Sequence, residues 1–332
     1  MNHILITGGA GFIGTHLTHR LISEGRKVTI LDNLSVGKTE NIKQWFNNPN
    51  FTFIRGDLKN PKDIVEAIQG SQTVFHLAAN PEVQVGETHP HIHFQENLVA
   101  TFNLLEAMRK SKTAKTIIFT STSTIYGEAT TIPTPENYGP LTPISTYGAT
   151  KLGCEALTTS YAHTFNLSVL ILRLANIVGP EANHGVIPDF IRKLKTNPNR
   201  LEILGNGSQN KSYLYINDCM DAILHATEIF LKSNRKVDIY NIGSTDQITV
   251  KRIAEIVTEE MHLPNVNFSF TGGVDEGRGW KGDVRNMHLS TEKLAKTKWK
   301  PKHTSEQATR LATRSLLKTR NCKQLEQNFQ EI

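Results

Sequence analysis

The feature that most constrains the fold is the alternation of strand-like and helix-like segments over the first half of the chain. Apolar runs rich in β-branched residues recur, and stretches with helical spacing, such as 11–25 and 97–111, separate them. This alternation predicts parallel strands joined by right-handed crossovers through helices. The sequence therefore predicts a doubly wound α/β fold with a parallel sheet. The predicted strands are 3–8, 27–32, 51–56, 73–78, 115–121 and 168–174.

The first predicted strand runs directly into TGGAGFIG, which places Gly8, Gly11 and Gly14 ahead of a helix. Glycines at this spacing allow a tight turn, a close approach of the backbone to a pyrophosphate and close packing of helix on strand. The N-terminus of the helix then presents amide donors and partial positive charge to the phosphates. Strand, glycines, helix and second strand occur in this order within the first 32 residues, which favours a Rossmann-type dinucleotide site.

Asp32 ends the second predicted strand, where its carboxylate can accept hydrogen bonds from ribose hydroxyls and would repel a 2′-phosphate. Neither Asn33 nor Leu34 offers a cation for that phosphate, so the sequence favours NAD over NADP. Asp57 follows the third strand and is a candidate for reading the adenine edge, although Gly-Asp is also common in turns. The cofactor-binding candidates in this part of the sequence are Gly8, Gly11, Phe12, Ile13, Gly14, Asp32, Asn33, Asp57, Leu58, Asn97 and Thr120.

The segment STYGATK at 145–151 carries Tyr147 and Lys151 one helical turn apart. A free phenol has a pKa near ~10, and a cation roughly 4–5 Å away supplies about 3–4 kcal/mol at an effective dielectric constant near ~20. With the positive charge of an oxidised nicotinamide added, we expect the pKa of Tyr147 to fall toward neutrality, so that it can act as acid and base. Taken alone, the pair also fits a packed ring beside a solvated charge.

The character of the sequence changes after residue 175, where turn-forming residues become frequent. We expect 1–175 to be an NAD-binding Rossmann domain, with a further strand at 237–243 returning to its sheet. We assign 176–236 and 244–316 to a smaller α+β substrate-binding lobe, with a hairpin within 200–216. The polar residues 317–332 are expected to form a tail.

Composition excludes several classes of function. No run approaches 18 apolar residues, so no membrane span is expected, and the strand-like start leaves no room for a signal peptide. The net charge of +6 is spread along the chain without a basic helix interleaved with aromatics, which disfavours nucleic acid as a partner. Three scattered cysteines, and histidines at 88–94 without supporting ligands, predict neither a disulfide framework nor a metal site. A cytoplasmic enzyme is expected.

A series of motifs in a fixed order gives the chain a family resemblance. It resembles the extended short-chain dehydrogenase/reductase family, in its NAD-dependent nucleotide-sugar epimerase and dehydratase branch, with closest similarity to UDP-glucose 4-epimerase-like proteins. The resemblance covers about residues 2–316. Its motifs are TGGAGFIG, LDNLSVGK, GDL, FHLAAN, FTSTSTIYGE, YGATK, RLANIVGP, GVIPDFI and YNIGS.

The resemblance implies roles for individual residues. It makes Tyr147 the catalytic base, Lys151 its partner, and Thr122 the hydroxyl that binds the sugar. It places Leu77, Ala78 and Ala79 along the cofactor, with Tyr147 and Lys151 also touching it. The residues that it implies for the substrate are Thr122, Tyr147, Asn176, Val186, Ile187, Lys211, Tyr213 and Arg278.

Two positions depart from the family pattern. Lys211 stands where an arginine is usual, which keeps the charge but weakens bidentate recognition of phosphate. Trp280 stands where an arginine commonly precedes Gly-Asp by two residues. Arg278 or Lys281 could supply the missing charge, and the sequence leaves this choice open.

The resemblance also implies the reaction. The Asp-Glu pair of the 4,6-dehydratases is replaced here by Ser123-Thr124, and the glutamate typical of decarboxylases is missing from this stretch. We therefore expect a nucleotide-diphosphate-sugar 4-epimerase of the UDP-glucose/UDP-galactose type. It would oxidise C4 transiently and return hydride to the opposite face. A reductase or dehydratase of the same family is the alternative, with a non-catalytic NAD-sensing protein as a third. The resemblance also implies a homodimer paired near 97–110 and 147–164.

Overall fold

The computed structural model describes residues 3–330, and the side chains of residues 3–318. Contacts divide the chain into two units. The first contains 1–127, 136–174 and 220–242, and the second contains 128–135, 175–219 and 243–332. The expected assignment of 176–236 to a substrate lobe is therefore wrong for the helix at 220–232. This helix belongs to the first unit, where Asp221 pairs with Arg20 at 2.6 Å.

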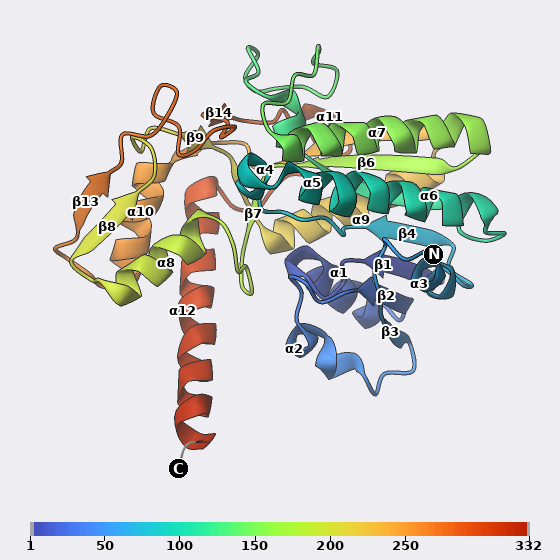
Figure 1. The fold of residues 1–332 in the computed structure, drawn as a ribbon, viewed down its shortest axis with the longest axis horizontal. Coiled ribbons are helices and arrows are strands. Elements are labelled where there is room, and N and C mark those ends of the chain that lie inside the picture. The colour runs from blue at the N-terminus through green and yellow to red at the C-terminus, as the bar shows by residue number, and fades with distance from the viewer. Residues whose placement is uncertain (1–2, 331–332) are drawn as a thin grey trace. The chain divides into compact units, whose positions relative to one another are not determined.

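The first unit is built on a seven-stranded parallel sheet (Figure 1). The strand order is β11-β6-β5-β4-β1-β2-β3, so the chain winds outward in both directions from β1. A reversal of this kind leaves a crevice at the carboxyl ends of the central strands, where ligands bind in such sheets. The strands are β1 (His3–Thr7), β2 (Lys27–Asp32), β3 (Phe51–Arg55), β4 (Thr73–His76), β5 (Thr116–Thr122), β6 (Ser168–Leu174) and β11 (Val237–Ile242).

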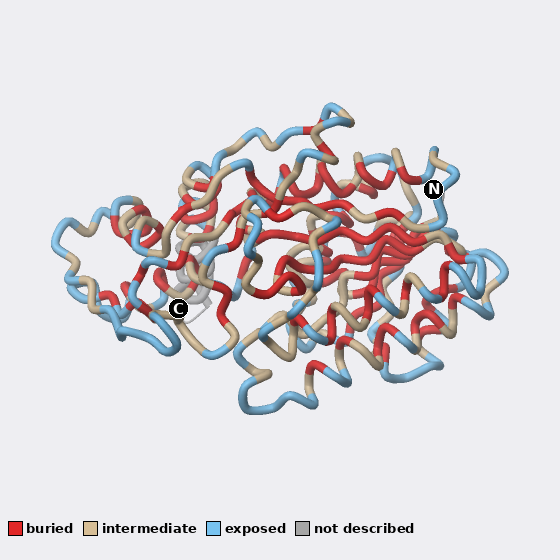
Figure 2. The backbone as a smooth tube through the Cα atoms, turned by 90° about the horizontal axis from the view of Figure 1, so that it is seen from above, coloured by how far each residue is buried: buried red, intermediate tan, exposed pale blue. Residues whose placement is uncertain are grey.

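Helices cover both faces of this sheet because its strands are apolar on both sides (Figure 2). One core cluster joins strands β1, β4, β5 and β6 to three helices, through side chains such as Phe119, Leu104 and Tyr161. The three helices are α3 (Pro61–Ala67), α6 (Ala100–Lys110) and α7 (Thr146–Phe165). The other long helices of this unit are α1 (Phe12–Ser23) and α9 (Ile216–Lys232), whose first turn lies in the second unit.

Short helical segments complete the first unit. The most unusual is a π-helix that joins α5 directly to α6, a geometry that occurs frequently at functional sites. The segments are α2 (Thr39–Ile42), the 3₁₀ turn η1 (Lys43–Trp45), α4 (Val85–Thr88), α5 (Pro90–His93), the π-helix η2 (Phe94–Val99) and the 3₁₀ turn η3 (Ser123–Tyr126).

The second unit contains small sheets and helices. Its strands are β7 (Asn176–Val178), β8 (Arg200–Ile203), β9 (Asn210–Lys211), β10 (Tyr213–Tyr215), β12 (Ile248–Thr249), β13 (Asn267–Phe270) and β14 (Asn286–Met287). The expected hairpin within 200–216 is wrong. Strand β8 instead pairs in parallel with β13, whereas β9 lies between β12 and β14, and β10 pairs with β7.

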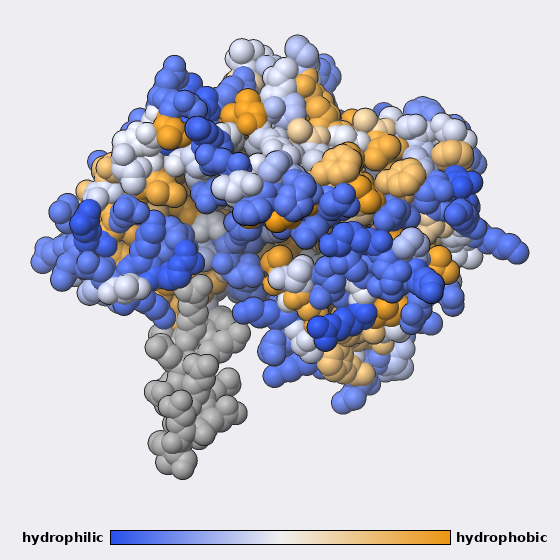
Figure 3. Space-filling view, viewed as in Figure 1, coloured by the Kyte–Doolittle hydropathy of each residue, from blue (hydrophilic) through white to orange (hydrophobic). Residues whose placement is uncertain are grey.

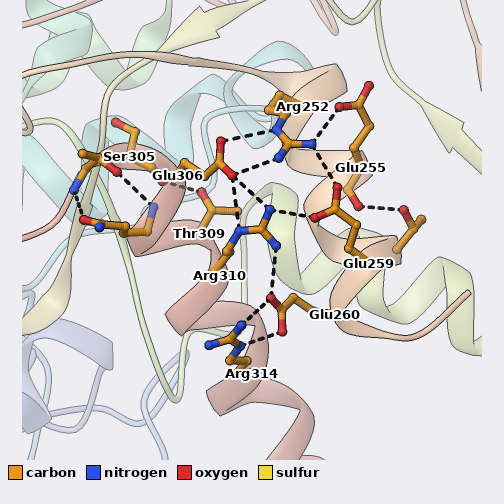
Figure 4. A network of polar contacts seen from close by, with 12 residues as sticks. Arg252, Glu255, Glu259, Glu260, Ser305, Glu306, Thr309, Arg310 and Arg314 are labelled. Carbon is orange, nitrogen blue, oxygen red and sulfur yellow. Dashed lines mark hydrogen bonds and ion pairs between the residues drawn. The ribbon is translucent and has the colours of Figure 1, made fainter.

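The helices of the second unit are α8 (Val186–Thr196), α10 (Val250–Glu260), α11 (Glu292–Ala295) and α12 (Ser305–Gln330). Helices α8, α10 and α12 share an apolar core with β8. A network of charges also joins α10 to α12 (Figure 4). Arg252 donates a hydrogen bond to Glu306 at 2.9 Å, and Glu260 accepts hydrogen bonds from Arg310 and Arg314.

Helix α12 reaches into the predicted tail at 317–332 and continues to Gln330, while the last two residues lie outside the described part. None of the helices in the described part of the chain is long and apolar enough to cross a membrane.

Candidate active site

The glycine-rich turn after β1 is closed too tightly to accept side chains. Gly8 has a φ of +72°, and a Cβ atom there would lie 2.8 Å from the Ala78 Cα. A Cβ atom at Gly14 would lie 2.3 Å from the Gly8 carbonyl oxygen. Only glycine therefore fits at both positions, which lets the turn close tightly on itself and on the segment after β4.

Helix α1 begins at this turn without a side-chain cap. Its N-cap residue, Gly11, is extended and has no side chain to satisfy the first amides, so Phe12 and Ile13 start a helix whose N-terminus can accept an anion. The cradle and the uncapped helix fit the pyrophosphate of a dinucleotide such as NAD.

The polar residues expected to contact the adenosine half lie at the ends of β2 and β3. The Asp32 carboxylate accepts hydrogen bonds from the amides of Ala10 at 2.9 Å and Leu34 at 2.8 Å. Burial raises the pKa of Asp32, and these two bonds oppose the shift. Asn33 donates to Asp57 at 3.0 Å, which brings the two together. Each carboxylate oxygen of Asp32 keeps a second lone pair for a ribose hydroxyl.

The segment after β4 closes against the same turn. The amides of Leu77 and Ala78 donate to the carbonyl and the hydroxyl of Thr7. Asn97, in the π-helix, accepts from the Asn80 amide at 2.8 Å, and Thr120 on β5 donates to the His76 carbonyl at 3.1 Å. Leu58, also expected to contact the cofactor, is 7% exposed, and Ala79 is half-buried.

Thr122, Tyr147 and Lys151 meet at one corner of the first unit. Helix α7 begins at Thr146 because Ser145 caps it by accepting from the Gly148 amide at 3.1 Å. Tyr147 lies in the first turn, where its hydroxyl hydrogen bonds to that of Thr122. Lys151 follows one turn later and is 3% exposed, with its ammonium 4.5 Å from the centre of the Phe119 ring.

The protonation states of this corner differ from the expectation. Burial raises the pKa of Tyr147 to about 12, and the bond from Thr122 only partly opposes this. Burial also lowers the pKa of Lys151 to about 8, while Cys154 and Glu155 favour its charged form. In the protein alone, desolvation therefore dominates at Tyr147, which is a neutral phenol at pH 7.

Two features of this corner were missed in the sequence. His93 is fully buried, and its ring packs edge-on to that of Tyr147. The Glu155 carboxylate, one turn beyond Lys151, is paired in the interior with Arg173 at 2.8 Å. The histidine lies in a stretch considered only for metal binding, and the arginine lies on another strand.

In the second unit, the expected diphosphate-binding lysine has a counter-ion. Lys211 pairs with Asp283 at 2.5 Å, and the other oxygen of this buried carboxylate accepts from the Gly279 amide at 3.1 Å. The Lys211 ammonium also lies 5.6 Å from the centre of the Trp280 ring, so the two departures from the family pattern are in contact. Burial, with Asp283, raises the pKa of Tyr213.

Arg278 is also held by acceptors of its own unit. It pairs with Glu128 and donates to the Asp283 carbonyl at 2.6 Å, whereas Lys281 is exposed. Asn176 donates to the Ser212 carbonyl at 3.3 Å. Val186 and Ile187 begin α8, and Ile187 is 1% exposed, so its side chain serves the core of the unit.

The cradle, the strand-end aspartate and the Tyr-Lys pair on one helix define a short-chain dehydrogenase/reductase. The profile of the NAD dependent epimerase/dehydratase family matches residues 4–243, and the chain belongs to this family. It is an NAD-dependent enzyme of the epimerase type.

Individual relatives agree with this assignment. A Methanocaldococcus jannaschii protein assigned as a UDP-glucose 4-epimerase is 33% identical, over 90% of this chain and 93% of its own length. A UDP-galactose 4-epimerase structure is 41% identical, with a TM-score of 0.84 over 96% of this chain and 99% of its own. A Bacillus cereus UDP-glucuronic acid 4-epimerase, solved with UDP-glucuronic acid and NAD, is 27% identical with a TM-score of 0.84 over the same shares.

Proposed function

We propose that this protein is an NAD-dependent 4-epimerase of nucleotide-diphosphate sugars, with a UDP-hexose of the glucose/galactose type as substrate. The observation that carries the proposal is the corner at the end of β5. There the hydroxyls of Thr122 and Tyr147 form a hydrogen bond, and Lys151 is buried one helical turn after Tyr147. The next residues, Ser123 and Thr124, cannot exchange protons at neutral pH, so this stretch lacks the acid and base that elimination of water requires.

Tyr147 takes the proton of the sugar 4-hydroxyl and gives it back, while Thr122 holds that hydroxyl. A bound NAD would supply the acceptor and donor of the C4 hydride and a positive charge on its oxidised ring. The protein alone holds the pKa of Tyr147 at about 12. Bringing it near 7 requires about 7 kcal/mol of preferential stabilisation of the phenolate. The charge of Lys151 and that of the oxidised cofactor act in this direction.

The second unit supplies the candidate residues for the nucleotide. Both cations of this unit already have partners. We assign the diphosphate to Lys211 because it is paired with one carboxylate, that of Asp283, whereas Arg278 is held both by Glu128 and by the Asp283 carbonyl. The lysine at position 211 is compatible with a diphosphate, since it provides a point charge where an arginine provides a fork, whereas Trp280 supplies no charge. The proposed substrate-binding residues of this unit are Asn176, Val186, Ile187, Lys211, Tyr213 and Arg278. Ile187 would contribute its backbone, because its side chain lies in the core.

The test is a panel of UDP-glucose, UDP-galactose, UDP-N-acetylglucosamine and UDP-glucuronate, incubated with the purified protein and followed by NMR. Interconversion of UDP-glucose and UDP-galactose without net use of NAD is expected. Interconversion of another C4 pair would keep the reaction and change the sugar. Consumption of NAD(P)H would identify a reductase, and a product lighter by one water a dehydratase. If no sugar reacts in the presence of NAD while UDP still binds, the proposal is wrong.

We also propose a homodimer paired through α6 and α7, and a cytoplasmic location. Apolar side chains gather over this region of the first unit (Figure 3), and Phe94, Phe102 and Phe165 are 49%, 44% and 39% exposed. Large exposed aromatics in one region are typical of protein interfaces. Light scattering should give twice the mass of the 37.1 kDa chain, and cell fractionation tests the location. A monomer in light scattering would contradict the proposed dimer.

A further inference from the structure

We infer that His93 is a positioning residue for Tyr147, which fixes the ring and the backbone of the proposed base before substrate arrives. The inference rests on the proposed role of Tyr147 and adds a residue that the motifs of the family do not contain. His93 ends α5, directly before the π-helix, and is fully buried. It therefore acts through other residues and does not touch the substrate.

The first contact is between the two rings. The imidazole of His93 and the phenol ring of Tyr147 are 5.5 Å apart between their centres, with an angle of 66° between their planes. This edge-to-face arrangement is favourable for aromatic pairs beyond the area that it buries. It restricts rotation of the Tyr147 side chain about its Cα–Cβ bond, which sets the position of the hydroxyl next to Thr122.

The second contact runs through side chains to the backbone of Tyr147. The amide nitrogen of Asn97 faces Nδ1 of His93 and the hydroxyl of Thr150, at 3.4 Å each. Thr150 donates to the Tyr147 carbonyl at 2.9 Å. The side-chain amide of Asn97 is held in this orientation because its Oδ1 accepts a hydrogen bond from the backbone amide of Asn80. His93 thus reaches Tyr147 both at the ring and, through this relay, at the start of α7.

The relay defines the protonation state that His93 needs. An amide nitrogen only donates, so Nδ1 of the imidazole is the acceptor and the proton of the neutral ring is on Nε2. Burial, which lowers the pKa of His93, favours this neutral form. The backbone carbonyls of Val83 and Glu82 and the carboxylate of Glu96 oppose the shift.

The short helix α4 lies against the imidazole on another side. A Cβ atom at Gly86, in α4, would lie 2.9 Å from Cδ2 of His93 and 3.1 Å from the Cβ of Thr146. The hydroxyl of Thr146 reaches the Gly86 carbonyl at 3.4 Å. His93 is therefore enclosed between α4 and the residues that begin α7, and it has little freedom to move away from Tyr147.

The consequence is a separation of turnover from binding. If the ring of His93 is removed, Tyr147 gains rotational freedom and its hydroxyl is aligned with the sugar for a smaller fraction of the time. Small misplacements of a reacting group cost up to about a hundredfold in rate. The buried His93 is proposed to touch neither UDP nor NAD, so their affinities should change little.

The experiment compares H93A and H93F, with H91A at a neighbouring exposed histidine as the matched control. For the sugar that turns over, H93A should lower kcat by about tenfold to a hundredfold with dissociation constants of UDP and NAD within about twofold of wild type. H93F keeps an aromatic ring against Tyr147 but lacks the Nδ1 acceptor, and it should recover most of this loss in kcat. H91A should behave as wild type. Full activity of H93A, failure of H93F to improve on it, or a parallel loss of kcat, ligand binding and melting temperature would overturn the inference.

A second measurement does not depend on turnover. Two-bond ¹H–¹⁵N spectra of histidine-labelled wild type, with the signal assigned through H93F, should show His93 neutral with its proton on Nε2 at pH 7. A proton on Nδ1, or a charged ring, would overturn the relay. If the wild type converts no sugar, the proposed function fails on its own panel, while these spectra still decide the contact with Asn97. They also remain decisive if H93A does not fold.

Discussion

The candidate site residues of the two units differ in how their charges are matched. At the corner of the first unit, Tyr147 and Lys151 are desolvated, and both are pushed toward their neutral forms. In the second unit, the cation of Lys211 is matched by the Asp283 carboxylate and that of Arg278 by Glu128. Desolvated groups are sensitive to a charge that arrives with a ligand, whereas matched cations hold a fixed geometry. This difference matches the proposed roles, which are proton transfer at the first corner and binding at the second cluster.

The largest effect is expected at Tyr147. Y147F removes the proposed acid and base while keeping the ring, so kcat should fall about 10³-fold while the affinity for UDP changes by less than about twofold. Steady-state kinetics and calorimetry measure the two effects. The matched control is Y161F on the same helix, because the Tyr161 hydroxyl donates to Glu106 at 2.7 Å. If Y147F turned over as fast as Y161F, the assignment of the base would be wrong.

The second prediction concerns Lys151 in the cofactor-free protein. Its pKa is lowered from 10.5 to about 8, so between these pH values the unfolded state binds the additional proton and the wild type gains stability as pH rises. Below pH 8 the lysine is charged in both states, and its burial costs about 3 kcal/mol. K151M should therefore be more stable than wild type at pH 7 by up to about that amount.

The advantage of K151M should shrink as the pH rises toward 10.5, and denaturant unfolding at several pH values measures it. The exposed Lys112 offers a control, since K112M should follow the wild type at every pH. If the difference in free energy of unfolding between K151M and wild type did not change with pH, burial would not lower the pKa of Lys151.

The third prediction tests the paired cluster. K211M removes the charge proposed for the diphosphate, and affinity for UDP should fall about tenfold, as expected for a charge-assisted hydrogen bond. K211R keeps the charge and should bind UDP at least as well as the wild type. Calorimetry with UDP and with uridine separates the cases, because uridine has no phosphate. Equal losses for both ligands in K211M would contradict a role at the diphosphate.

The smallest effect is expected at Arg278, and it addresses the choice that the sequence left open between Arg278 and Lys281. The Arg278 guanidinium is held by Glu128 and by the Asp283 carbonyl, so R278Q should change the affinity for UDP by less than about threefold. The same calorimetry applies. A loss as large as that of K211M would mean that the ligand takes Arg278 from Glu128.

Much of the first unit could be predicted because its signals are local. The glycines at 8–14, Asp32 at a strand end and the alternation of segments each lie within a short window of sequence, and the structure has the expected parallel sheet. The pairing of β8 with β13 could not be predicted, because a parallel partner far along the chain leaves no local pattern.

The site shows the same limit of local information. The sequence placed Tyr147 and Lys151 one turn apart, but their pKa values depend on burial, which spacing does not reveal. The counter-ion of Lys211 is Asp283, which approaches only because β9 and β14 pair. His93 was missed because its partner Tyr147 lies on another element, and only the fold brings the two rings together.

The most direct test of the proposed reaction follows the hydrogen at C4 of the sugar. We would incubate the protein with UDP-glucose deuterated at C4 and examine the product by NMR. The proposed reaction predicts UDP-galactose that retains deuterium at C4, since hydride leaves and returns within one site without exchange with water. UDP-galactose that carries solvent hydrogen at C4, or no epimerised product from a protein that binds UDP and NAD, would contradict it.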